Sequence, residues 1–198
     1  MRSTCLFLAG GNSKRTPIPK GLILHNEMPW LLNQLQELEE QFAGELTIVL
    51  GFHSEAYLKN ISKLATLKTV LNPKPENGQF SSLLVGLESL KSYDAVFVLP
   101  LDVPCPKKAV WQALKKNLKN HSIVIPCYQS QGGHPVLLSQ AFTETLKSVP
   151  VNSAGARLDR QIHLEKKSKI FRLDVEDPKV MVNLNTEKDF KDFRNRAF

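Results

Sequence analysis

Apolar runs of strand length alternate with amphipathic stretches of helical spacing along this chain. Such alternation predicts an α/β protein with a mostly parallel sheet between two layers of helices, a three-layer α/β/α arrangement. The expected strands are 5–9, 46–50, 68–71, 95–99, 122–126, a strand after a glycine turn near 132, 169–173 and 180–184. The expected helices cover 29–42, 54–64 with Ser54 as its cap, a segment capped by Ser81 or Ser82, 107–118, 139–148 and 153–164, with a last one from 186. The most hydrophobic strand, 95–99, is expected in the middle.

Composition narrows the class of protein. The 198 residues suit one domain, 1–198, and no apolar run approaches the length of a membrane helix. Because the N-terminus lacks the pattern of a signal peptide, we expect a cytoplasmic protein whose three scattered cysteines are buried free thiols. The net charge of +7 is spread without long basic blocks, which favours an anionic small molecule over nucleic acid as partner.

The first expected strand ends at Gly10-Gly11, and a polar loop follows. Two glycines allow a tight turn and close approach to a ligand. Arg15 and Lys20 add positive charge, so free backbone N–H groups and cations together predict a polyphosphate site. The loop matches neither of the common glycine-rich phosphate motifs. An ordinary turn with a solvated basic face is the alternative.

Asp102 follows the central strand, between Pro100 and Pro104. Ligands of open α/β sheets bind at the carboxyl ends of strands, and a rigid carboxylate there suits Mg²⁺. The alternative is a structural role, in which Asp102 caps the helix that begins near Lys107.

Five short segments follow one another along the chain: Leu-Ala-Gly-Gly-x-Ser-x-Arg-x4-Lys (8–20), Gly-x-x-Ser-Ser-Leu (78–83), Gly-His-Pro-Val (133–136), Gly-Ala-Arg (155–157) and Asn-Leu-Asn-Thr (183–186). In this order they resemble segments of the MobA/MocA-like molybdenum-cofactor nucleotidyltransferases. Each is weak alone, but together they span nearly the whole chain. The resemblance implies the nucleotide-diphospho-sugar transferase fold, which is GT-A-like and Rossmann-like.

The resemblance also implies a reaction and a set of roles. A phosphate monoester attacks the α-phosphorus of an NTP and pyrophosphate leaves, a step governed by alignment and charge neutralisation. Arg15 would stabilise the departing pyrophosphate, Lys20 would bind the α-phosphate, and Asp102 and Asn185 would hold Mg²⁺. His134 would contact the substrate; the alternative for it is a turn residue with one ring nitrogen bonded to the backbone. The nucleotide-binding residues would be Leu8, Ala9, Gly10, Gly11, Asn12, Ser13, Asn72, Gly78, Ser81 and Ser82. His25, His53, His121 and His163 are expected at the surface or at an edge.

Departures from the family pattern leave the substrates open. Thr16-Pro17 replaces the usual Met-Gly, and Glu187 replaces the proline after Thr186. The first loop looks guanylyl-like, whereas the segments at 78–82 and 133–136 look cytidylyl-like, so CTP is expected over GTP. The expected acceptor is the molybdopterin cofactor, with a molybdoenzyme or cofactor chaperone as a candidate partner. The alternatives are a guanylyl- or sugar-phosphate nucleotidyltransferase and a non-catalytic nucleotide- or cofactor-binding homologue.

Overall fold

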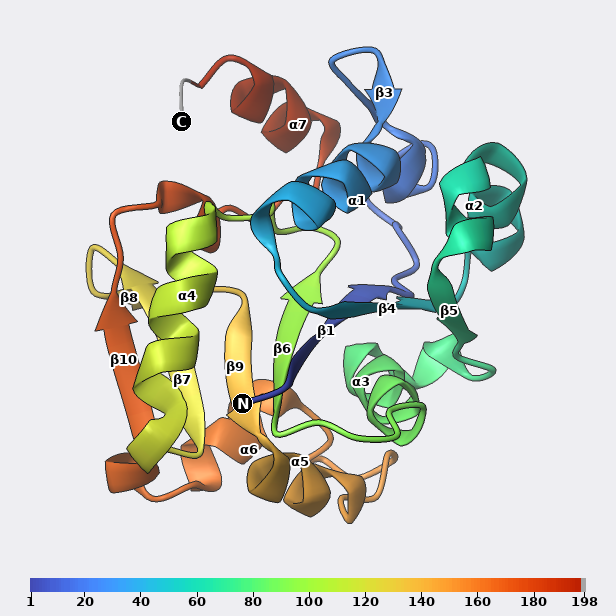
Figure 1. The fold of residues 1–198 in the computed structure, drawn as a ribbon. Coiled ribbons are helices and arrows are strands. Elements are labelled where there is room, and N and C mark those ends of the chain that lie inside the picture. The colour runs from blue at the N-terminus through green and yellow to red at the C-terminus, as the bar shows by residue number, and fades with distance from the viewer. Residues whose placement is uncertain (197–198) are drawn as a thin grey trace.

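A computed structural model describes residues 1–196, and a seven-strand path runs through its main sheet (Figure 1). The order is β10-β7-β9-β6-β1-β4-β5, with β8 paired to β7 at the side, and β2 and β3 form a separate hairpin. The strands are β1 (Ser3–Ala9), β2 (Leu24–His25), β3 (Met28–Pro29), β4 (Glu45–Leu50), β5 (Lys68–Leu71), β6 (Ala95–Pro100), β7 (Ile123–Tyr128), β8 (Gln131–Gly132), β9 (Val136–Ser139) and β10 (Ile170–Asp174).

The main sheet is mostly parallel, as the sequence predicts. Strands β5, β4, β1 and β6 pair in parallel, and β10 pairs in parallel with β7. Along the path only β9 runs the other way, antiparallel to both of its neighbours, β6 and β7. Strand β6 is the fourth of the seven, which confirms the central place expected for the most hydrophobic run.

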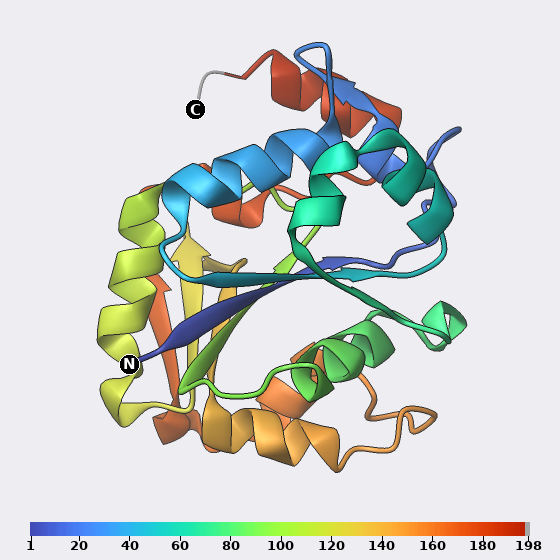
Figure 2. The same ribbon diagram turned by 45° about the vertical axis from the view of Figure 1, so that its right-hand side comes forward.

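Helices cover both faces of the sheet because each strand supplies side chains to both (Figure 2). In β1, Cys5 and Phe7 belong to the core cluster on one face, and Leu6 and Leu8 to that on the other. The first cluster holds residues of α1 (Trp30–Gln41), α2 (Ser54–Asn60), α4 (Lys108–Asn117) and α7 (Glu187–Arg194). The second holds residues of α3 (Gln79–Glu88), α5 (Gln140–Lys147) and α6 (Leu158–Leu164).

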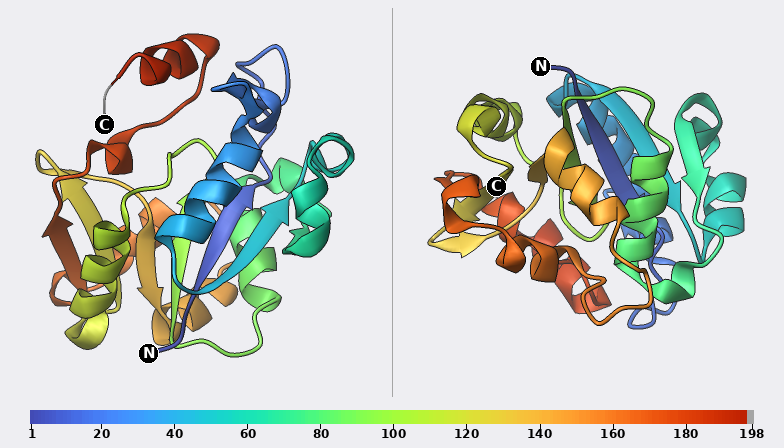
Figure 3. Two further views of the ribbon diagram at one scale, coloured as in Figure 1. Left: turned by 45° about the horizontal axis from the view of Figure 1, so that its top comes forward. Right: turned by 90° about the horizontal axis from the view of Figure 1, so that it is seen from below.

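The C-terminal helix α7 lies beside the β2–β3 hairpin and the start of α1 (Figure 3). Ring centroids of Phe190 and Trp30 are 5.5 Å apart, and those of Phe193 and His25 are 5.4 Å apart. His25, expected at the surface or at an edge, lies in the β2–β3 hairpin but is only 9% exposed, because the rings of Trp30 and Phe193 pack against it; the expectation of an exposed side chain is therefore wrong. Trp30 is close to His25 in sequence, but Phe193 comes from the other end of the chain, so the burial of His25 could not be predicted from its local sequence.

The expected strand at 180–184 is also wrong. Residues Pro178–Met181 form a 3-10 helix, which the side chain of Asp177 caps by accepting from the Lys179 N–H at 3.1 Å. Val180 and Leu184 are buried in the core without pairing in the sheet. Their hydrophobicity therefore reflects burial rather than a strand, and Pro178 at the first helical position favours the turn. The expected helix at 153–164 is likewise shorter, and spans Leu158–Leu164.

Two predicted serine caps are absent. Helix α3 begins at Gln79 after Gly78, whose φ of 86° is a left-handed conformation that favours glycine. Ser81 and Ser82 therefore lie inside its first turn. Helix α2 begins at Ser54 itself and has no side-chain cap.

Two expectations from composition can be compared with the described residues. Cys5, Cys105 and Cys127 are free and buried, as expected. None of the helices within residues 1–196 combines the length and apolar character needed to cross a bilayer.

Candidate functional site

The glycine turn and Asp102 meet at the carboxyl edge of the sheet because they follow neighbouring parallel strands. Gly10 follows β1 and Asp102 lies two residues after β6, and these strands pair along their length. The Leu101 N–H extends the pairing by donating to the Leu8 carbonyl at 3.0 Å. This is the edge at which open α/β sheets bind ligands.

Gly10 is required by close packing. A Cβ atom at this position would lie 2.7 Å from Oγ of Ser82, whereas one at Gly11 would meet nothing within 4 Å. The Asn72 amide holds Ser82 in place by donating to Ser82 Oγ at 3.0 Å and to Ser81 Oγ at 2.9 Å. The first turn of α3 therefore packs closely against Gly10, whereas the space beside Gly11 remains open.

The loop after the glycines is folded back on itself. The N–H and Oγ1 of Thr16 both donate to the carbonyl of Ser13, at 3.1 and 3.0 Å, and the Lys20 N–H donates to Ser13 Oγ at 3.0 Å. Within residues 1–196, the N–H groups of Gly11, Asn12 and Ser13 donate to no protein acceptor. Three unused donors beside two cations form a suitable cradle for phosphate oxygens.

Four polar side chains from three parts of the chain converge on this loop. Lys20 Nζ lies 3.5 Å from Asp102 Oδ2 and 3.2 Å from Asn185 Oδ1. Arg15 donates to the same Asn185 oxygen at 2.8 Å. The residues predicted to carry catalysis and to bind the metal are thus brought together, although 170 positions separate Arg15 from Asn185.

The C-terminal segment is fastened to Asp102 through its backbone. The Leu184 N–H donates to the carbonyl of Asp102 at 2.7 Å. Asp189 accepts from the N–H groups of Asn185 and Thr186 at 2.9 and 2.8 Å, which closes a capping box at the start of α7. Burial opposes ionisation of Asp189, but these hydrogen bonds outweigh it and lower its pKa.

The alternative role for Asp102, as a helix cap, is filled by another residue. Asp177 accepts from the Lys107 N–H at 2.7 Å, at the start of α4. The Asp102 carboxylate points to Lys20 instead, and its side chain is 28% exposed.

Lys20 is held in an environment that disfavours its charge. Its side chain is 13% exposed, and this burial lowers its pKa although the nearby Asp102 acts to raise it. Arg15 lowers the pKa of Lys20 further. An anionic ligand would place a negative charge beside Lys20 and Arg15 and so favour the charged form of Lys20.

A cavity of about 360 Å³ opens beside this cluster. Of the predicted site residues, it is lined by Leu8, Gly10, Gly11, Asn12, Ser13, Lys20, Gly78, Ser82 and Asp102. Ala9, Asn72 and Ser81 are buried and do not line it, so the structure places them in its support. Sequence reasoning did not assign Phe52, Pro75, Glu76, Gln79 or Leu101 to the site, although all of them line the cavity; Gln79 occupies an unspecified position of the segment 78–83.

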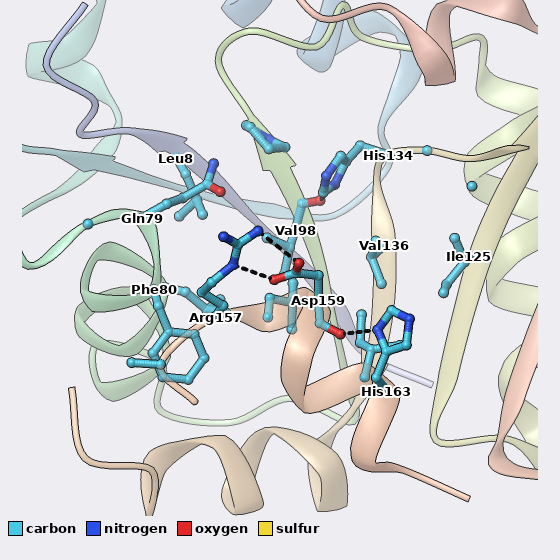
Figure 4. Close-up of a pocket in the computed structure, with 18 of the residues that line it drawn as sticks. Leu8, Gln79, Phe80, Val98, Ile125, His134, Val136, Arg157, Asp159 and His163 are labelled. Atoms are coloured by element: carbon cyan, nitrogen blue, oxygen red, sulfur yellow. Dashed lines mark hydrogen bonds and ion pairs between the residues drawn. The ribbon is translucent and has the colours of Figure 1, made fainter. Parts of the chain in front are cut away.

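A larger cavity of about 770 Å³ adjoins the first, and the two share Leu8, Gly78 and Gln79 (Figure 4). Its floor is apolar, with side chains such as Val98, Ile125 and Val136, whereas its rim is polar. The rim residues include Asn77, His134, Arg157, Asp159, His163 and Arg172. Arg157 makes a two-point contact with Asp159, at 3.0 and 2.9 Å.

His134 lines the larger cavity, and Arg15 and Asn185 line neither. Four of the five segments singled out in the sequence contribute to this second cavity: it is lined by Leu8, by Gly78 and Leu83, by residues of Gly-His-Pro-Val and by residues of Gly-Ala-Arg. Asp159, His163 and Arg172 follow no motif and were missed.

Comparison with known proteins agrees with this geometry. A family model described as the MobA-like NTP transferase domain matches residues 5–167. The chain belongs to this family. A search of curated proteins finds no match.

Solved structures share the fold of this MobA-like NTP transferase at low sequence identity. Rv0371C of Mycobacterium tuberculosis H37Rv, in complex with manganese, is 19% identical over 100% of both chains, with a TM-score of 0.80. A nucleotidyl transferase from Methanothermobacter thermautotroptrophicus is 15% identical over 98% of this chain and 96% of that one, with a TM-score of 0.78. Molybdopterin-guanine dinucleotide biosynthesis protein A from Archaeoglobus fulgidus is 15% identical over 97% of each, with a TM-score of 0.73.

The polar cluster fits one kind of metal ion. Asp102 Oδ2 and Asn185 Oδ1 flank the same ammonium nitrogen, so both oxygens face one small region. Among residues 1–196, no group of three or more His, Cys, Asp or Glu side chains could hold a metal. Two oxygens so placed, one of a carboxylate and one of an amide, are of the type that ions such as Mg²⁺ take from a protein, with phosphate and water completing the shell.

Proposed function

We propose that this MobA-like NTP transferase moves a nucleotidyl group from an NTP to a phosphate monoester and releases pyrophosphate. An oxygen of the acceptor phosphate forms a bond to the α-phosphorus, and the bond from that phosphorus to the bridging oxygen of pyrophosphate breaks. The observation that carries the proposal is that Arg15, Lys20, Asp102 and Asn185 converge beside the smaller cavity, which Lys20 and Asp102 line and which adjoins the larger one.

The position of each site residue indicates its role in the transfer. The free N–H groups of the glycine loop would hold the phosphates, and the cations of Arg15 and Lys20 would balance the charge that builds up as pyrophosphate leaves. The larger cavity would hold the body of the acceptor. Because a phosphate monoester is already an anion, no general base is required.

Asp102 and Asn185 would hold Mg²⁺, which would bind phosphate oxygens and neutralise their charge. The manganese bound by the M. tuberculosis relative supports a divalent ion in this fold. Chelation by EDTA should therefore stop turnover, and added Mg²⁺ should restore it.

We further propose CTP as the preferred nucleotide and the molybdopterin cofactor as the acceptor, in the cytoplasm. The basis is the likeness of the segments at 78–82 and 133–136 to the cytidylyl branch; Gly78 and Ser82 line the smaller cavity and His134 the larger one. A smaller base pocket would reject GTP by size and by unpaired groups on the base edge.

The deciding experiment measures pyrophosphate release with each NTP, Mg²⁺ and a panel of acceptors that includes molybdopterin and sugar phosphates. Calorimetric titration of each NTP accompanies it. Release that depends on CTP and molybdopterin supports the full proposal. Tighter GTP binding would move the protein to the guanylyl branch, and release only with sugar phosphates would change the acceptor. NTP binding without any release would leave a non-catalytic binding protein.

A further inference from the structure

His134 lines the larger cavity and its backbone is held by hydrogen bonds to other segments. Its backbone N–H donates to the carbonyl of Val180 at 2.9 Å, and the preceding Gly133 N–H donates to that of Pro126 at 2.8 Å. A Cβ atom on Gly133 would lie only 2.1 Å from the Val180 oxygen. The backbone that carries the imidazole is therefore held against two other segments, which fixes the point from which the ring extends.

The hydrogen bond of the ring decides its tautomer. Nδ1 of His134 lies 3.3 Å from the carbonyl oxygen of Val98, beside which the ring is seen in Figure 4. A carbonyl oxygen only accepts, so Nδ1 must carry the proton. Burial lowers the pKa of His134, although Val98 and Asp102 both act to raise it, and the neutral ring is therefore favoured.

The second ring nitrogen of His134 is Nε2. In a neutral ring with the proton on Nδ1, Nε2 has a lone pair and can only accept. Nε2 of His134 has no hydrogen-bond partner within residues 1–196, and it is not sealed from solvent as Nδ1 of His25 is. Since His134 lines the larger cavity, this acceptor is available to a molecule inside it.

Resting on the proposed function, we infer that His134 selects acceptors that carry an O–H or N–H donor close to their phosphate. Nε2 accepts that hydrogen bond and so orients the acceptor between the cavity and Asp102. The group contacted is not a phosphate oxygen, because a neutral Nε2 has no proton to donate to one. This makes His134 a residue of specificity rather than another cation for the phosphates.

The first test needs no ligand. In protein labelled with ¹⁵N-histidine, the NMR signals of His134 at pH 7.5 should show a proton on Nδ1 and none on Nε2. His134→Asn identifies the signals by their loss. A proton on Nε2, or a doubly protonated ring, would overturn the inference.

The second test compares two phosphate monoesters with the same three-carbon chain, sn-glycerol 3-phosphate and n-propyl phosphate. Only the first has hydroxyl donors. In the wild-type protein with Mg²⁺, glycerol 3-phosphate should bind about three- to tenfold more tightly, as one good hydrogen bond allows, and should shift the Nε2 signal. Equal affinities, including no measurable binding of either, would overturn the inference.

Two substitutions of His134 distinguish the role of the Nε2 lone pair from that of the ring as a whole. His134→Asn keeps an N–H donor for Val98 but has no acceptor at the Nε2 position, so it should lose the preference; His134→Gln can place an oxygen there and should keep part of it. The matched control is His121→Asn, because His121 also bonds a carbonyl through Nδ1, that of Asn117 at 2.9 Å, but lines neither cavity. A preference unchanged in His134→Asn would refute the role.

These outcomes are separable from those of the proposed function. A protein that binds no NTP but still prefers glycerol 3-phosphate through His134 would contradict nucleotidyl transfer and support the specificity role. A protein that releases pyrophosphate but shows no preference would do the reverse.

Discussion

Replacing Lys20 with methionine removes the ammonium group while keeping most of the apolar stem. The ammonium lies 3.5 Å from Asp102 and 3.2 Å from Asn185, in a position suited to the α-phosphate. By analogy with the loss of one donor at an oxyanion site, the transition state should lose about 2–4 kcal/mol. Since 1.36 kcal/mol is tenfold in rate, kcat for pyrophosphate release should fall by about 30- to 900-fold.

The stability of the Lys20→Met variant should not fall with its activity. Burial lowers the pKa of Lys20 despite the opposing effect of Asp102, so the folded protein disfavours the charge that Lys20→Met removes. The melting temperature should therefore be unchanged or higher, the pattern of a residue retained for activity rather than for stability.

The assay pairs steady-state pyrophosphate release with thermal unfolding. Lys116→Met is the matched control, because Lys116 is exposed on α4 and lines neither cavity. Arg15→Ala should also fold normally and lose turnover. The reasoning fails if kcat of Lys20→Met changes by less than about threefold, or if melting temperature and activity fall together.

Three further changes test other parts of the structure. Asp102→Asn should impair Mg²⁺-dependent turnover far more than stability, measured by kcat and thermal unfolding; wild-type activity that survives EDTA would contradict the metal role. Gly10→Ala should destabilise by about 1–3 kcal/mol in urea unfolding, because its Cβ would lie 2.7 Å from Ser82 Oγ. Adding Ser82→Ala should recover part of that loss, and no recovery would show that this contact is not the cause. His25→Phe should stabilise by about 1 kcal/mol, because within residues 1–196 Nδ1 of His25 is buried without a partner. Burial lowers the pKa of His25 below 6.5, and the positive charge of Arg194 lowers it further. As the pH falls, the unfolded chain therefore takes up the proton at a higher pH than the folded protein does. Stability should therefore fall as pH drops below about 6.5, and less steeply in His25→Phe; equal slopes would refute this.

Local patterns predicted most of the fold because hydrophobic spacing reports directly on burial. The alternation of Cys5, Leu6, Phe7 and Leu8 between the two faces of the sheet is an example. The antiparallel insertion of β9 between β6 and β7 could not be predicted in this way, since strand order depends on contacts between distant segments.

The candidate site was predictable where chemistry and position coincide in a short segment. The glycine loop and Asp102 each follow a strand, and the sheet brings strand ends together. The supporting role of Asn72 and Ser81 was not visible, because the same polar residues that bind ligands can also be buried as braces. The rim of the larger cavity was mostly missed, since its residues come from several elements and share no spacing.

The hydrogen bond between Lys20 and Asn185, which lie 165 positions apart, has a consequence while the chain is being synthesised. A nascent chain that has emerged as far as β9 has the glycine turn, Lys20 and Asp102, but lacks the residue to which both Lys20 and Arg15 are bonded. The polar cluster is therefore completed only when the segment after β10 docks. Chains released before that point would carry an unfinished cluster, so premature termination would not leave fragments with the geometry of the finished site.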